Sequence, residues 1–183
     1  MDRKFVVVSG LPGSGKSWLA SKLAPLLGLA VIDKDDILER LFDLKGVGDS
    51  DWGRALSRES DLIFRRESEA SPGALLVSHW HLPGMPSASG TPTDWLPGLS
   101  SRIVNLHCEC SAEVAAARFS QRKRHSGHLD YAKSREQILA SLQDLLRLKP
   151  LEIGERVSVD TSAEITFREL ATRISSAFER PSG

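Results

Sequence analysis

Short apolar runs alternate along the chain with longer stretches in which apolar residues recur at helical spacing. The apolar runs are rich in β-branched residues and predict five strands, over residues 5–9, 30–32, 74–78, 103–106 and 157–159. The longer stretches predict six helices, over residues 16–27, 35–42, 52–70, 112–122, 133–148 and 163–178. Because strands and helices alternate, we expect a parallel sheet that is covered by helices on both faces.

Two segments depart from this alternation. Residues 81–100 hold four of the nine prolines, which excludes a helix or a central strand and predicts a long loop. Residues 122–130, RKRHSGHLD, form a basic connection between two predicted helices, where we expect a lid over about residues 118–133. Ser111 and Ser162 precede predicted helices and are expected to cap them, because a serine oxygen accepts from a helix N-terminal N–H.

The composition is typical of one globular domain. The 183 residues carry 24 basic and 24 acidic side chains, and this zero net charge disfavours, without excluding, a nucleic-acid partner. No apolar run reaches membrane-spanning length and the first strand begins too early for a signal peptide, so we expect a cytoplasmic protein.

The two cysteines, Cys108 and Cys110, are too close in sequence for a scaffold disulfide, and we expect them to be reduced. They stand next to His107 in the sequence HCEC, at the end of a predicted strand. Strand alternation sends the cysteines to one face and His107 to the other, which disfavours a zinc site.

The stretch GLPGSGKSW, residues 10–18, follows the first predicted strand and opens the first predicted helix. Its glycine, lysine and serine spacing satisfies the P-loop pattern, in which backbone N–H groups and a helix N-terminus surround a phosphate chain. We expect Lys16 to reach the β- and γ-phosphates and the Ser17 hydroxyl to bind Mg²⁺. The predicted nucleotide contacts here are Gly10, Leu11, Pro12, Gly13, Ser14, Gly15, Lys16, Ser17 and Trp18.

Three aspartates follow the second predicted strand, in the sequence VIDKDDILERL. Ligands of open parallel sheets bind at the carboxyl ends of the strands, so these aspartates are candidates for the acceptor side of a reaction. Asp33 and Asp35 alternate and would point the same way from an extended segment, whereas Asp36 is expected to cap the next helix. Asp35 is the candidate general base toward an attacking hydroxyl, and Asp33 is a candidate metal or substrate contact and the alternative base.

Basic side chains gather at the end of the helix predicted over residues 112–122. Arg118 and Arg122 are four residues apart and would share a helix face, and Arg124 follows where we expect the lid. Arginines carried by a lid stabilise the charge of a transferring phosphoryl group. A solvated basic face is the alternative interpretation.

Together, GLPGSGKS and IDKDDILERL resemble the small P-loop kinases that phosphorylate hydroxyl groups, over residues 5 to about 178. The group includes the polynucleotide 5′-kinase domain, chloramphenicol phosphotransferase and zeta-toxin-type kinases, and more loosely gluconate, shikimate and adenylylsulfate kinases. The resemblance implies that Asp35 is the general base and that Arg118 and Arg122 are lid arginines. It also implies an adenine-contacting loop at Thr161 and Ser162, and RHSGH, residues 124–128, is similar to an RHPGH signature in this group.

One position departs from the usual P-loop pattern. The third predicted strand ends in SHW, residues 78–80, where many P-loop proteins carry an acid that holds the water shell of Mg²⁺. Asp33 or Asp35 would take that role, or the metal would rest on Ser17, the phosphates and water. His79 either contacts the acceptor or packs against the sheet. Three tryptophans either pack in the core or form an apolar wall for the acceptor: Trp52, Trp80 and Trp95. For Trp95 we expect the wall, because it lies inside the proline-rich loop.

The sequence thus predicts an α/β fold of the P-loop NTPase type, with three layers, a five-stranded parallel sheet and a short helical lid. We expect an ATP- and Mg²⁺-dependent phosphotransferase with a small hydroxyl compound as acceptor, contacted by Asp33, Asp35, His79 and Arg124, beside an acceptor-side loop over residues 80–100. Alternatives are a nucleoside, nucleotide or polynucleotide 5′-kinase and a regulatory ATP-binding module without catalysis. The aspartates disfavour a nucleoside-monophosphate kinase, because a phosphate acceptor needs no base.

Overall fold

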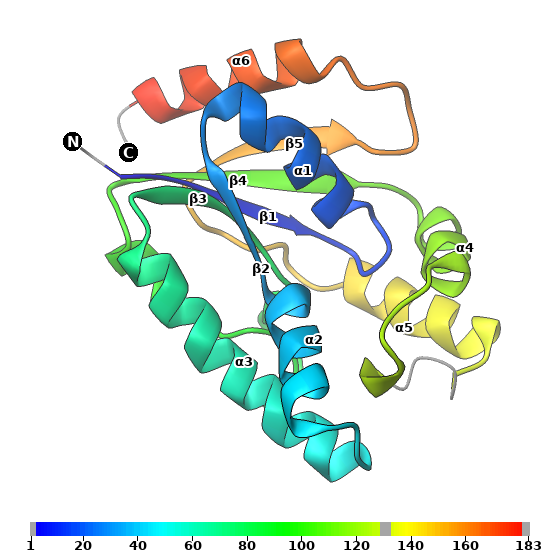
Figure 1. Cartoon of the computed structure of the whole chain (residues 1–183). Helices are drawn as coiled ribbons and strands as arrows, with labels where there is room; N and C mark the ends of the chain where they lie inside the picture. The colour runs from blue at the N-terminus through cyan, green and yellow to red at the C-terminus, as the bar shows by residue number, and fades with distance from the viewer. Residues whose placement is uncertain (1–2, 129–132, 181–183) are drawn as a thin grey trace.

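A single five-stranded sheet forms the centre of the molecule (Figure 1). The computed structural model describes residues 3–128 and 133–180. All strand pairs are parallel, in the order β2-β3-β1-β4-β5. The strands are β1 (Lys4–Gly10), β2 (Ala30–Asp33), β3 (Gly73–Val77), β4 (Arg102–Glu109) and β5 (Glu155–Asp160). Each lies where the apolar runs predicted it, which confirms the parallel α/β fold.

In residues 3–128 and 133–180, six α-helices and two short 3₁₀ turns join and cover the strands. The helices are α1 (Lys16–Leu27), α2 (Lys34–Lys45), α3 (Ser50–Ala70), α4 (Ala112–Gln121), α5 (Arg135–Leu146) and α6 (Phe167–Glu179). The 3₁₀ turns are η1 (Leu96–Gly98) and η2 (Ser126–His128). None of the helices in the described part of the chain has the length and apolar character needed to cross a membrane.

Local capping chemistry explains where the helices begin. Ser111 caps α4 as predicted, and Ser134 forms a capping box with Gln137 at the start of α5. The prediction for Ser162 is wrong: its N–H and hydroxyl donate to the Asp160 carboxylate, and α6 begins only at Phe167. The local turn satisfies Ser162 before the helix starts, so it cannot serve as a cap.

The two faces of the sheet pack against different elements because strand side chains alternate. On one face, Val6 and Val8 join a core with α1 and α6. On the other face, Phe5 and Val7 pack with α3 and the segment between β3 and β4. Figure 1 shows α6 and α1 on one side of the sheet and α3 on the opposite side, the three-layer arrangement predicted from the sequence.

The proline-rich segment between β3 and β4 belongs to the core. Trp80 and Trp95 are buried against Phe64 of α3, with ring centroids 5.7 and 6.0 Å away. Their indole N–H groups donate to the carbonyls of Val8 and Pro92. The prediction of an acceptor wall at Trp95 is therefore wrong, because this ring is enclosed by core side chains.

The two cysteines are free thiols, as predicted. Cys108 is buried on the α1 and α6 side of β4, while His107 faces the other side and contacts Ser9. Burial raises the pKa of Cys108 to about 12, so its thiol stays protonated. Within residues 3–128 and 133–180 no group of three or more metal-binding side chains comes together.

Candidate active site

The P-loop lies at the carboxyl end of β1 and presses against its neighbours. Gly10 and Gly13 have φ values of 131° and 82°, which L side chains rarely adopt. A Cβ atom on Gly10 would stand 2.5 Å from the Cys108 carbonyl oxygen, and one on Gly13 would stand 2.3 Å from that of Ala115. The glycines are thus required both by backbone conformation and by contact with β4 and α4.

The polar groups of the loop are arranged for an anion. The Lys16 ammonium group donates to the carbonyls of Gly10 and Leu11 at 3.0 and 2.9 Å, across the loop. Gly15 precedes α1 without a side-chain cap, and the first turn of α1 carries no acidic residue. The buried Ser14 hydroxyl has no hydrogen-bond partner within the described residues. A cradle with an uncapped helix N-terminus, a lysine and an orphaned hydroxyl fits a phosphate chain.

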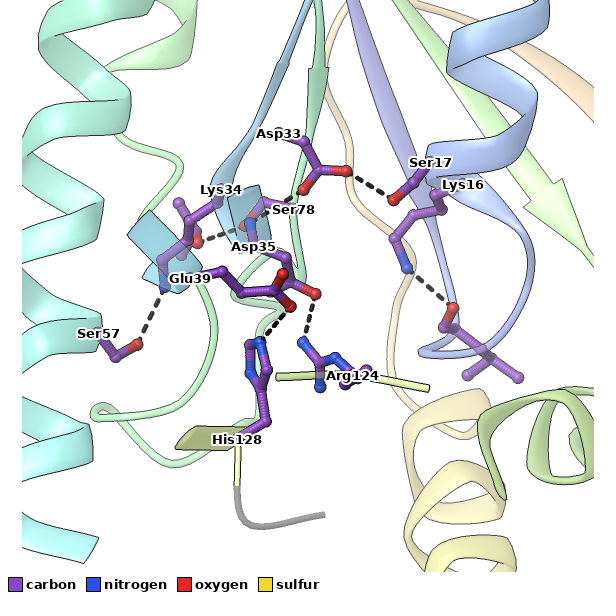
Figure 2. Close-up of polar contacts among 12 residues, drawn as sticks. Lys16, Ser17, Asp33, Lys34, Asp35, Glu39, Ser57, Ser78, Arg124 and His128 are labelled. Atoms are coloured by element: carbon purple, nitrogen blue, oxygen red, sulfur yellow. Dashed lines mark hydrogen bonds and ion pairs between the residues drawn. The ribbon is translucent and has the colours of Figure 1, made fainter. Parts of the chain in front are cut away.

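The side-chain oxygens of Ser17 and Asp33 lie together beside Lys16 (Figure 2). The Ser17 hydroxyl donates to one Asp33 carboxylate oxygen at 2.6 Å, while the other oxygen accepts from the Asp35 backbone N–H at 2.9 Å. Burial raises the pKa of Asp33 to about 6, against the opposing hydrogen bond from Ser17. Serine and aspartate oxygens at a P-loop are ligands of the kind that Mg²⁺ takes.

The hydrogen bond from the Asp35 N–H to Asp33 corrects the prediction that the two aspartates alternate along an extended segment. Asp33 ends β2 and caps α2, so Asp35 stands in the first turn of the helix rather than in an extended strand. The two side chains consequently do not alternate on one strand. Asp36 is exposed in this turn and is not the cap.

Asp35 forms an ion pair with Arg124 at the centre of the site (Figure 2). Burial alone would raise the pKa of Asp35, but positive charge, led by Arg124 and including Arg122 and Lys16, outweighs it. The pKa of Asp35 is therefore held below its usual value, and the carboxylate is ionised at neutral pH. Asp35 is half-exposed, so a ligand in the cleft can reach it.

The RHSGH segment, residues 124–128, packs along α2. His128 pairs with Glu39 at 2.9 Å and His125 pairs with Asp43 at 3.3 Å. The Phe42 ring stacks on His125 with centroids 5.3 Å apart and meets His128 edge-on at 5.6 Å. These contacts hold the segment so that Arg124 reaches Asp35. The sequence analysis singled out RHSGH but not its partners on α2, Glu39 and Asp43, which are four residues apart and so lie on one helix face.

A polar network that the sequence analysis also missed connects Lys34, the neighbour of Asp35, with α3 and the segment after β3. Lys34 forms an ion pair with Asp61 of α3 at 2.8 Å. Thr91 donates to Asp61 at 2.9 Å and shares a hydrogen bond of 2.6 Å with Ser78 at the end of β3. The position after β3 is therefore linked to a carboxylate through Thr91, although the strand itself ends without an acid.

His79 follows the end of β3 and lines the cleft. Its surroundings desolvate the ring, and the charges of Lys16 and Lys34 add to this effect, so that the pKa of His79 falls to about 4. The imidazole is neutral at physiological pH.

The two arginines predicted for the lid lie close to the P-loop. Arg118 donates to the Thr161 carbonyl at 2.8 Å and its guanidinium lies near Gly15. Arg122 follows the last residue of α4, so it does not share a helix face with Arg118, and its guanidinium lies 4.0 Å from the Phe119 ring centroid. Residues 129–132 of the predicted lid lie outside the described residues.

One cleft of about 920 Å³ joins most of the predicted site. Its walls include Pro12, Gly13, Gly15, Lys16, Ser17, Trp18, Asp33, Asp35, His79, Arg118, Arg122 and Arg124. Gly10, Leu11, Ser14, Thr161 and Ser162 are not among its walls, and Thr161 instead fixes Arg118. Met85 and Pro86, from the loop predicted on the acceptor side over residues 80–100, also line the cleft. Leu148 after α5 lines it too, and no sequence motif marked this residue.

Comparison with known proteins gives relatives in structure rather than in sequence. Neither a protein-family model nor a curated protein matches the sequence. A "putative kinase" from Chloroflexus aurantiacus superposes with a TM-score of 0.76 at 20% identity, over 97% of this chain and 99% of that one. A shikimate kinase from Bacteroides thetaiotaomicron gives 0.57 at 15% identity, over 97% and 99% of the two chains. A gluconokinase from Sinorhizobium meliloti gives 0.52 at 16% identity, over 98% and 93%. The chain thus has the fold of P-loop kinases.

Proposed function

We propose that this protein transfers the γ-phosphate of ATP to a hydroxyl group of a small molecule. The observation that carries the proposal is that one cleft contains both Lys16 of the P-loop and an ionised, ligand-accessible Asp35. A P-loop alone accounts for nucleotide binding, whereas a carboxylate on the acceptor side accounts for the activation of a hydroxyl. Similarity in fold to a shikimate kinase and a gluconokinase agrees with this class of reaction.

The P-loop and its neighbours bind the donor in this proposal. Backbone N–H groups of the loop and Lys16 hold the β- and γ-phosphates, and Arg118 and Arg122 approach the same space from the end of α4. Ser17 and Asp33 are the residues that would hold Mg²⁺, which neutralises phosphate charge when bound. Trp18 is half-exposed at the cleft and lies edge-on to Phe167, so it offers an aromatic surface near the donor.

Asp35 accepts the proton of the acceptor hydroxyl as the hydroxyl oxygen attacks the γ-phosphorus. The bond from that phosphorus to the bridging oxygen of the β-phosphate breaks, and the electron pair leaves with ADP. Because Arg124 pairs with Asp35, the acceptor must insert between them or lie against both. Arg124 and His79 are then acceptor contacts, and neutral His79 can donate or accept a hydrogen bond.

The proposal is tested by ADP release from ATP in the presence of a panel of nucleosides, sugars, hydroxy acids, antibiotics and oligonucleotide 5′ ends. We expect one class of small hydroxyl compound to stimulate ADP release, Lys16→Ala to abolish it, and Asp35→Asn to reduce it by orders of magnitude while ATP still binds. Asp36→Asn is the matched control, because Asp36 lies in the same helical turn outside the cleft.

Three results would contradict the proposal. Stimulation by oligonucleotides alone would make the protein a polynucleotide 5′-kinase. ATP binding without stimulation by any acceptor would favour a regulatory module. Equal turnover of Asp35→Asn and wild type, with loss in Asp33→Asn, would move the base to Asp33.

A further inference from the structure

A second cavity of about 280 Å³ lies beside the first residues of the P-loop, on the face of the sheet opposite α1 and α6. Its apolar walls come from segments far apart in the sequence, among them Trp80, Leu82, Leu145 and Leu151. Its volume is just below the range of about 300–1,000 Å³ that is typical of drug-sized ligand sites. The cavity contains none of the residues assigned to the metal or to the base.

His107 of β4 is a polar residue in the wall of this cavity. The hydrogen bonds around it determine which of its ring nitrogens carries the proton. Ser9 donates its only hydroxyl proton to the Asn105 side-chain oxygen at 2.6 Å. The assignment of that oxygen follows from the Asn105 amide, which donates to the Leu151 carbonyl at 2.8 Å. Ser9 must therefore accept at its second contact, the His107 Nδ1 atom at 2.9 Å.

This chain of hydrogen bonds determines what His107 offers to a ligand. With the proton on Nδ1, the neutral ring keeps a bare lone pair on Nε2. Burial and the nearby charge of Arg156 lower the pKa of His107, so the ring is neutral at physiological pH. Within the described residues, the His107 ring has no hydrogen bond other than the one to Ser9.

The Arg156 and Trp80 side chains at this cavity already have partners. Arg156 pairs with Glu109 at 3.6 Å and donates to Ser158 at 3.3 Å. The Trp80 N–H donates to the Val8 carbonyl at 2.8 Å, so this ring presents apolar surface. The cavity thus combines apolar walls with the His107 ring, which can accept a hydrogen bond at Nε2. His79 lines this cavity as well as the larger cleft.

We infer that this cavity is a second ligand site, which takes a small apolar molecule carrying one N–H or O–H donor directed at His107 Nε2. The inference stands apart from the proposed function, because neither Lys16 nor the residues assigned to the metal and the base line this cavity. The cavity shares Pro12, His79, Leu145 and Leu148 with the larger cleft, so the two sites are neighbours.

Indole is a suitable probe, because it is flat and apolar and has one N–H donor; indene has the same shape without the donor. Titration of the full chain, followed by ¹H–¹⁵N NMR, gives the affinity of each probe and the position of binding. We expect saturable binding of indole that shifts the Trp80 indole resonance, and an affinity about five- to tenfold higher than that of indene. A crystal structure of the complex should place the indole N–H on His107 Nε2.

His107→Leu removes the acceptor and keeps an apolar wall, so it should bind indole and indene equally. His81→Leu is the matched control, because His81 contacts the Ser89 carbonyl and is not among the walls of this cavity. It should keep the preference for indole. Absence of saturable indole binding by the wild type, equal affinity for both probes, or an unchanged preference in a folded His107→Leu variant would each overturn the inference.

Discussion

Arg124 and Asp35 are 89 residues apart in the sequence and form an ion pair at the centre of the cleft. Arg124 opens the RHSGH segment, and Asp35 stands in the first turn of α2. The pair joins the candidate base to the segment that follows α4. The chemistry of Asp35 therefore depends on how that segment packs on α2.

Replacing Arg124 should change the acidity of Asp35. In Arg124→Gln the largest stabilising charge is lost while burial remains, so the pKa of Asp35 should rise. The ionised pair stabilises the fold at neutral pH, and this contribution disappears as the pH falls below about 4 through the lowered folded pKa. Carbon-detected NMR titration of the aspartate carboxyl groups measures the change. Arg124→Lys should retain most of the lowering, and an unchanged Asp35 midpoint in Arg124→Gln would show that the ion pair does not form in solution.

Asp33 should titrate with a midpoint of about 6 in the ligand-free protein. Ser17→Ala should raise this midpoint further, because the lost hydrogen bond favours the ionised form. Since the folded pKa is raised, the wild type should lose stability relative to Asp33→Asn as the pH rises from 4 through 6. NMR titration and thermal unfolding of both proteins test this, and a midpoint near 4 would contradict it.

Gly13→Ala should lower nucleotide affinity by more than the strain of a positive φ alone would cause. The added Cβ would meet the Ala115 carbonyl at 2.3 Å, in addition to a φ of 82°. Gly28 is the matched control, because it has a φ of 64° and a Cβ atom added there would meet nothing within 4 Å. We expect Gly28→Ala to cost about 1–2 kcal/mol of stability with nucleotide affinity retained. Gly13→Ala should lower nucleotide affinity at least tenfold by calorimetry, and equal behaviour of the two variants would show that the contact with α4 is unimportant.

Gly127→Ala should disturb the docking of the RHSGH segment. An added Cβ would lie 2.5 Å from the Phe42 ring, although the backbone conformation there suits any residue. The displaced segment would carry Arg124 away from Asp35, so acceptor turnover should fall and the Asp35 midpoint should rise.

Gly53→Ala serves as the control for the Gly127 variant, since its added Cβ meets nothing within 4 Å in α3. It should be neutral or slightly stabilising, because alanine favours a helix over glycine. A Gly127→Ala variant with normal turnover and a normal Asp35 midpoint would show that the segment tolerates the ring contact.

The sequence was sufficient where structure follows from local patterns. The apolar runs predicted every strand of the sheet, and the glycine spacing of residues 10–17 correctly predicted a turn between β1 and α1. Helix ends were less predictable, because competing local hydrogen bonds decide them. Ser162 bonds to Asp160 instead of capping a helix, and Asp33 rather than Asp36 caps α2.

Contacts between distant segments were decided only by the tertiary structure. The sequence identified Asp35 and Arg124 as separate candidates, but their pairing depends on the packing of His125 and His128 around Phe42. The burial of Trp95 and the link from Ser78 through Thr91 to Asp61 likewise arise where the proline-rich segment meets α3. Residue spacing encodes the period of a helix or strand and the chemistry of a loop. It does not encode which side chains meet when those elements pack, and that packing sets the charge environment of Asp35.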